Sequence, residues 1–131
     1  MKYVLICIFE YANIQIHMGW IMENIIEVLK ALSNETRLRM INLLKAREIC
    51  VCDIMDTLGI TQTKASRHLK HLKSVGLVED RQQAQWVYYS IAHGIDERLI
   101  DELIARARIT EPYMSDLIKL EERKNRCGKE C

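Results

Sequence analysis

The chain has 131 residues, of which 49% are hydrophobic and 28% are charged, and its formal net charge is +1. These values are typical of one globular domain and exclude an intrinsically disordered chain. Five cysteines are too few, and odd in number, for a disulfide scaffold, so we expect a cytoplasmic protein whose thiols stay reduced and available for metal or redox chemistry.

The N-terminal segment has an apolar run from Tyr3 to Phe9 that Glu10 interrupts. No small-residue cleavage site and no apolar span of 18 residues follows, so the segment predicts neither secretion nor a membrane anchor. We expect residues 1–21 to be an extension, either an extra helix or residues ahead of the true start.

Two helices are predicted next. Residues 22–32 carry apolar side chains at helical spacing, and residues 33–46 form a second helix that Ser33 or Asn34 can cap. The expected buried stripe of this second helix consists of Leu38, Ile41 and Leu44.

A short helix from Val51 to Leu58 should end at Gly59, where a left-handed backbone is often required. Thr61 then caps a helix that runs to Val75, before Gly76. Strand-forming runs on both sides of residues 82–84 predict a hairpin, and two further helices should cover residues 96–109 and the stretch from Pro112 to about residue 126. This order predicts a winged helix-turn-helix, mainly α-helical with a small two-stranded β-wing.

The helix over residues 61–76 is basic, with four Lys or Arg residues and no acidic residue. Amide and small polar side chains at its start suit base edges in the major groove, and the cations suit phosphates. An ordinary solvated basic face is the alternative, but the preceding short helix and glycine turn favour DNA binding. The predicted DNA contacts are Gln62, Thr63, Lys64, Ser66, Arg67, His68 and Lys70.

Cys50 and Cys52 lie one residue apart in the stretch EICVCDIM. Alternate side chains share a face only in an extended chain, whereas in a helix they diverge. The pair is therefore either two unrelated buried thiols or a chelating unit whose backbone departs from helical geometry. Thiolates select soft or borderline ions. Asp53 is interpreted as a helix-start residue stabilised by the helix dipole rather than as a ligand.

Three stretches of the chain resemble the ArsR/SmtB family of metal-responsive winged-helix repressors: ALSNETRLRMINLL (31–44), EICVCDI (48–54) and GITQTKASRHLKHLKSVGLV (59–78), followed by the wing DRQQAQWVYYSI. The resemblance covers roughly residues 22–108 and is greatest to the repressors of arsenical-resistance operons. It implies a homodimer built from the first and post-wing helices, repression at a palindromic double-stranded operator, and release when a thiophilic ion binds. We therefore expect an N-terminal extension (1–21), a DNA-binding domain (22–109) and a C-terminal helix with a cysteine-containing tail (110–131).

The inducer implied by this resemblance is arsenite or antimonite, which bind three thiolates. Cadmium or lead, or a thiol-redox signal, is the alternative. Met55 stands where the similar repressors carry a third cysteine, so the remaining ligand is expected from Cys127 or Cys131, with Cys7 as the rival. The sequence has no phosphate-binding glycine loop and no CxxC beside a strand, so we predict that the protein is not an enzyme.

Overall fold

The computed structural model describes residues 25–93 and 97–126. In chain order the elements are α2 (Ile25–Leu32), α3 (Glu35–Ala46), β1 (Ile49–Cys50), α4 (Val51–Leu58), α5 (Gln62–Ser74), β2 (Val78–Gln83), β3 (Trp86–Ile91), α6 (Glu97–Ala107) and α7 (Tyr113–Arg126). The predicted winged helix-turn-helix is confirmed. None of the helices in these two ranges is long and apolar enough to cross a membrane.

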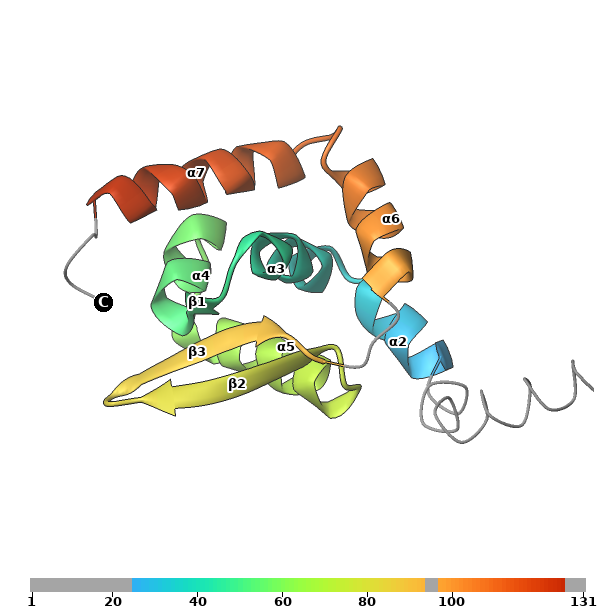
Figure 1. The fold of residues 1–131 in the computed structure, drawn as a ribbon, viewed down its shortest axis with the longest axis horizontal. Helices are drawn as coiled ribbons and strands as arrows, with labels where there is room; N and C mark the ends of the chain where they lie inside the picture. The colour runs from blue at the N-terminus through green and yellow to red at the C-terminus, as the bar shows by residue number, and fades with distance from the viewer. Residues whose placement is uncertain (1–24, 94–96, 127–131) are drawn as a thin grey trace, which may run out of the picture.

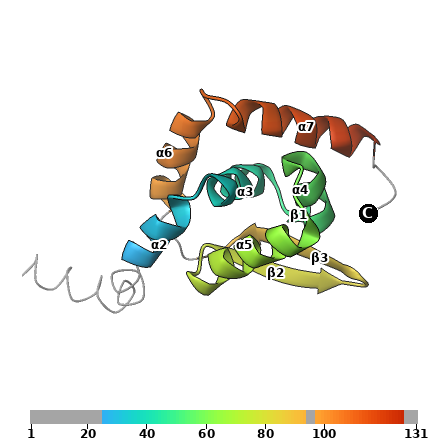
Figure 2. The ribbon, with the colours of Figure 1, turned by 180° about the vertical axis from the view of Figure 1, so that it is seen from behind.

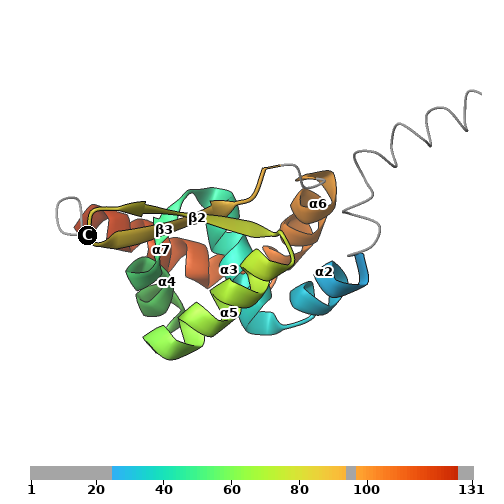
Figure 3. The same cartoon turned by 90° about the horizontal axis from the view of Figure 1, so that it is seen from below.

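The helices are arranged around α3, which lies at the centre of the molecule (Figure 1). One long side of α3 and α4 is covered by α7, while α5 and the β2–β3 hairpin lie on the opposite side (Figures 1 and 2). Seen from below, α5 lies in front of α3 (Figure 3). The two sides of α3 and α4 therefore meet different elements, α5 and the β2–β3 hairpin on one side and α7 on the other.

The predicted helix boundaries follow local capping chemistry. The Asn34 side chain accepts a hydrogen bond from the Arg37 N–H at 3.1 Å, which identifies Asn34 rather than Ser33 as the N-cap of α3. Thr61 caps α5 in the same way, and Gly59 ends α4 with a φ of +64°. At that φ a side chain would be strained, which explains why glycine occupies the turn between the two helices.

The core is more extensive than the predicted stripe of α3. This helix is buried over Met40, Ile41, Asn42, Leu43 and Leu44, whereas Leu38 is only partly buried. The reason is tertiary: α2, α4, α5 and α7 all pack on α3, so no broad side of this helix is left for solvent.

The sheet has one strand more than the sequence predicts. β2 and β3 pair antiparallel as the wing, and the two-residue strand β1 adds to the other edge of β3, with Ile49 opposite Tyr89 and Cys50 opposite Tyr88. A two-residue strand has no alternation that a sequence pattern could reveal. Its pairing ties the residue before α4 directly to the wing.

Candidate thiol site and nucleic-acid interface

Helix α5, the predicted recognition helix, has one buried and one exposed side. Ala65, Leu69 and Leu72 pack into the core. Of the predicted DNA contacts, six have exposed side chains: Gln62, Thr63, Lys64, Ser66, Arg67 and Lys70. These side chains are accessible to a DNA duplex, and their contact with DNA stays a prediction.

His68, the seventh predicted contact, is placed differently. It is only 8% exposed and lies on the core side of α5. Burial lowers the pKa of its imidazole below the usual 6.5, and the nearby cations, Arg37 first among them, lower it further. A neutral, buried imidazole contributes packing to the helix rather than charge for a phosphate.

The wing is attached to the helix-turn-helix by ion pairs. Lys73 at the end of α5 contacts Asp80 on β2 at 2.7 Å. Arg81, also on β2, binds the carboxylate of Glu48, the residue before β1. Its guanidinium carbon lies 4.7 Å from the centre of the Tyr88 ring. These ion pairs therefore join the wing to α5 at one end and to Glu48, two residues before Cys50, at the other.

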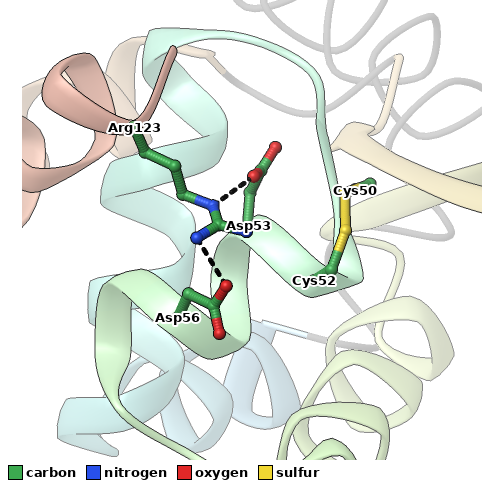
Figure 4. The surroundings of a disulfide bond; sticks show 5 residues. All are labelled: Cys50, Cys52, Asp53, Asp56 and Arg123. Atoms are coloured by element: carbon green, nitrogen blue, oxygen red, sulfur yellow. Dashed lines mark hydrogen bonds and ion pairs between the residues drawn. A yellow bond between two sulfur atoms is a disulfide. The ribbon is translucent and has the colours of Figure 1, made fainter. Parts of the chain in front are cut away.

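Cys50 and Cys52 lie at the junction of strand and helix. Cys50 ends β1 with an extended backbone (φ −80°, ψ 160°), and Cys52 is the second residue of α4. Their Cα atoms are 5.4 Å apart, and the two sulfurs are joined as a disulfide (Figure 4). The backbone therefore departs from helical geometry at Cys50, and this departure lets two side chains of i, i+2 spacing converge.

Asp53 completes a compact group with the two thiols. One ligand atom from each of Cys50, Cys52 and Asp53 can be chosen so that all three lie within 4.8 Å of one another. The Asp53 carboxylate also accepts a 2.6 Å hydrogen bond from Arg123 Nε of α7 (Figure 4). Its position in the first turn of α4 agrees with the predicted helix-start role, and its pairing with α7 was not predicted.

Arg123 is the residue near the site that sequence reasoning missed. Its Nη1 also contacts Asp56 on α4, so one guanidinium joins two carboxylates of the same helix (Figure 4). The i, i+3 spacing of the two aspartates could have indicated a shared cation. Nothing in the sequence indicates that an arginine 70 residues downstream of Asp53 supplies it.

The candidates for a third thiolate, Cys7, Cys127 and Cys131, lie outside the described residues. Met55, at the position of the expected third cysteine, is partly buried and packs against the hydrophobic core. Its thioether therefore serves packing. The last described helix, α7, ends at Arg126, one residue before Cys127.

Comparison with known sequences identifies relatives of this chain. A sequence model of the bacterial regulatory protein, arsR family, matches residues 34–80. The arsenic resistance transcriptional regulator ArsR2 of Pseudomonas putida is 48% identical over 66 residues, 50% of this chain and 57% of ArsR2. The arsenical resistance operon repressor of Escherichia coli is 42% identical over 81 residues, 59% of this chain and 69% of the repressor. A cadmium resistance regulatory protein CadC homolog of Staphylococcus aureus is 33% identical over 85 residues, 64% of this chain and 67% of the homolog.

Solved structures show the same fold. The homodimeric winged helix-turn-helix domain Mb0332 of Mycobacterium bovis, a possible ArsR-family regulator, is 35% identical with a TM-score of 0.57. The match covers 68% of this chain and 79% of that domain. The match to ArsR2 spans little more than half of that relative's length.

Proposed function

Because the chain belongs to the bacterial ArsR family of regulatory proteins, we propose that it represses an arsenic or metalloid resistance operon and leaves its operator when arsenite or antimonite binds its thiolates. The observation that carries this proposal is the convergence of Cys50 and Cys52 at the start of α4. Arsenite reacts with thiols by exchanging its hydroxyl groups for sulfur, releasing one water for each As–S bond formed. The Cys50–Cys52 disulfide is first reduced to two thiols by an external thiol, which is itself oxidised to a disulfide, and the two thiols then supply two of the three bonds.

The third bond is assigned to Cys127 or Cys131 of the same protomer. Support comes from the course of α7, which crosses α3 and then contacts α4 through Arg123 beside the thiol pair. The chain thus reaches the site's own helix four residues before Cys127. If Cys127 or Cys131 completes the site, Cys7 is dispensable.

Release from DNA follows from the position of the thiol pair. Cys50 belongs to the sheet that contains the wing, and Cys52 belongs to α4, which packs against the recognition helix α5. An ion that sets the distance between the two sulfurs therefore sets the relation between wing and recognition helix. Ion and operator then favour different conformations, and their binding is negatively coupled.

The DNA contacts are assigned to the exposed polar face of α5. Gln62 and Arg67 have the side chains able to read adenine and guanine edges, while Lys64 and Lys70 suit phosphates. A homodimer would present two such helices to a palindromic operator. Its interface is assigned to α2 and α6, which lie at one flank of the molecule and expose Ile26, Leu29 and Leu99 (Figure 1).

The DNA assignment is tested by operator binding at several salt concentrations. Replacing Lys70 with Ala should weaken binding to specific and nonspecific DNA alike and reduce the salt dependence by about one phosphate contact. Replacing Arg67 with Ala should lower discrimination between operator and unrelated DNA. Lys119→Ala, which removes an exposed cation of α7 on the side of α3 opposite α5, is the matched control. Equal effects of all three substitutions would contradict the assignment.

The inducer assignment is tested by titrating arsenite against the protein–operator complex under reducing, anaerobic conditions. Cys50→Ser and Cys52→Ser should each leave operator binding intact and abolish release. Cys7→Ser should respond like the unmodified chain, and the double substitution of Cys127 and Cys131 should weaken the response. Release of the Cys50→Ser variant at the unmodified arsenite concentration would disprove the proposal. Parallel titrations with cadmium and lead distinguish the alternative ions.

A thiol-redox sensor is the second candidate, favoured by the disulfide between Cys50 and Cys52. With a peroxide as oxidant, one thiolate would be oxidised to a sulfenic acid with release of water or alcohol. The second thiol would then displace water to form the disulfide. Peroxide should in that case release the operator in the absence of metalloid, and dithiothreitol should restore binding. Arsenite release without any response to peroxide would favour the metalloid sensor.

A further inference from the structure

Helix α7 is attached by ion pairs at two places, to α3 near its start and to α4, beside the thiol pair, near its end. Near its start, Asp116 accepts two hydrogen bonds from Arg39 of α3, at 2.7 and 2.8 Å. Near its end, Arg123 binds Asp53 and Asp56 of α4, at 2.6 and 2.5 Å. The second attachment falls on the first two turns of the helix that carries Cys52.

The two sulfurs of the thiol pair are held by different elements. Cys50 is held by the sheet, where it pairs with Tyr88 of β3. Cys52 lies next to Asp53, whose carboxylate is bound by Arg123. The distance between the two sulfurs therefore depends on how α4 is oriented relative to β1. Arg123 of α7 forms ion pairs with α4 and so contributes to that orientation from outside the helix-turn-helix and the wing.

We propose that Arg123 is a positioning residue for the thiol pair: by bridging Asp53 and Asp56 it fixes the first turns of α4 so that Cys52 faces Cys50. The clamp occurs in a structure in which a disulfide joins the two sulfurs (Figure 4). Once that disulfide is reduced, the clamp keeps Cys52 facing Cys50, with Cα atoms 5.4 Å apart, so that both thiols reach one ion. A clamp that pre-organises the pair lowers the free-energy cost of closing the chelate and so raises ion affinity. This inference rests on the proposed use of the Cys50–Cys52 pair as an ion site.

The bridge needs arginine because two different N–H groups of one planar guanidinium reach the two carboxylates. A lysine ammonium at this position could hold one aspartate firmly but would not fit the same fork. A glutamine would hold neither by charge. The three side chains therefore form a graded series of clamp strength with similar helix propensities.

The test uses phenylarsine oxide, which takes up two thiols with loss of one water and so needs no third ligand. Full-length chains in a Cys7, Cys127 and Cys131→Ser background bind it through Cys50 and Cys52 alone. Affinity is measured by competition with a small dithiol. Arg123→Gln should weaken binding roughly five-fold, as expected for the loss of a partly exposed ion pair, and Arg123→Lys should weaken it less.

Asp56→Asn tests whether the effect runs through the bridge, because it removes one end of the clamp at an exposed position away from the sulfurs. It should also weaken binding, and the double variant with Arg123→Gln should be no weaker than Arg123→Gln alone. Arg106→Gln, which breaks an exposed ion pair on α6, is the matched control and should leave affinity unchanged. Thermal unfolding of each variant verifies that it is folded.

Two results would overturn the inference: an Arg123→Gln affinity within two-fold of the background chain, or equal weakening by Arg106→Gln. Additive effects of Arg123→Gln and Asp56→Asn would also count against a shared bridge. These outcomes differ from failure of the proposed function itself. In that case the background chain would not bind phenylarsine oxide through Cys50 and Cys52, and arsenite would not release the unmodified chain from its operator.

Discussion

The two ends of α7 are attached by the same chemistry in opposite surroundings. At the start of the helix, Asp116 is fully buried and Arg39 is 19% exposed. At the end, the Arg123 clamp holds Asp53, whose side chain is 13% exposed, and Asp56, whose side chain is 54% exposed. Each attachment joins one arginine to carboxylate, yet only the first has a fully buried acceptor, and the second has one largely buried and one half-exposed carboxylate.

This difference in burial separates a structural contact from an adjustable one. A buried carboxylate that loses its cation keeps the full cost of desolvation, so the Arg39–Asp116 pair must stay formed for α7 to stay docked. The half-exposed pair of Arg123 with Asp56 exchanges its partners with water at little cost. The end of α7 beside the thiols can therefore respond to an ion while its start remains anchored.

Breaking the buried attachment should have the largest effect. Arg39→Gln leaves the Asp116 carboxylate buried without its charged partner, and we expect a loss of about 3 kcal/mol in the free energy of unfolding. Urea unfolding followed by circular dichroism measures this change. Arg39→Lys is the control, since it keeps the charge and loses only the paired geometry. A loss below about 1 kcal/mol for Arg39→Gln would mean that the anchor is weak.

Asn42 provides the second test of the anchored end. This buried side chain of α3 donates to the Tyr113 carbonyl at 3.0 Å and accepts from Arg108 Nε at 2.8 Å. Asn42→Ala should cost roughly 2 kcal/mol, because two partners at the junction of α6 and α7 lose their hydrogen bonds. Faster hydrogen exchange should be confined to α7 and the residues before it. Uniformly faster exchange throughout the chain would argue against a local junction.

The exposed attachment should respond to salt, which sharpens the contrast. Asp56→Asn, which breaks only the half-exposed pair, should lower the free energy of unfolding by less than about 1 kcal/mol, and the difference from the unmodified chain should shrink in 1 M NaCl. The Arg39→Gln difference should persist in the same salt, because a buried pair is poorly screened. Equal salt sensitivity of the two variants would remove the distinction between the ends of α7.

A smaller effect should come from pH, and it should be independent of the ion pairs at the two ends of α7. The pKa of buried His68 is lowered in the folded protein, so below pH 6.5 the unfolded chain takes up this proton first and stability falls. His68→Gln should flatten the decline in unfolding free energy between pH 6.5 and 5. Arg39→Gln and Arg123→Gln should retain the decline, since neither residue is among the cations that lower this pKa. A pH profile unchanged by His68→Gln would assign the decline to another group.

Sequence patterns predicted the elements whose determinants are local. Asn34 and Thr61 as caps, Gly59 at the turn and the basic helix between residues 61 and 76 follow from neighbouring side chains and backbone preferences. The thiol pair was also recognisable, since its spacing and its resemblance to a known thiolate motif lie within seven residues. For these features the interacting groups are close in the chain.

Tertiary structure decided the features that depend on distant partners. The exposure of six predicted DNA contacts depends on how α5 packs against α3. The burial of His68 is different, because His68 lies within the helical arc of Ala65, Leu72 and Val75, and periodicity could have indicated it. The pairing of β1 with β3 and the clamp of Arg123 on α4 join residues tens of positions apart. Many arginines and aspartates in the chain could form such pairs, and only packing selects which of them meet. The sequence by itself determined the family, the reading helix and the two thiols, whereas the fold determined what holds those thiols together.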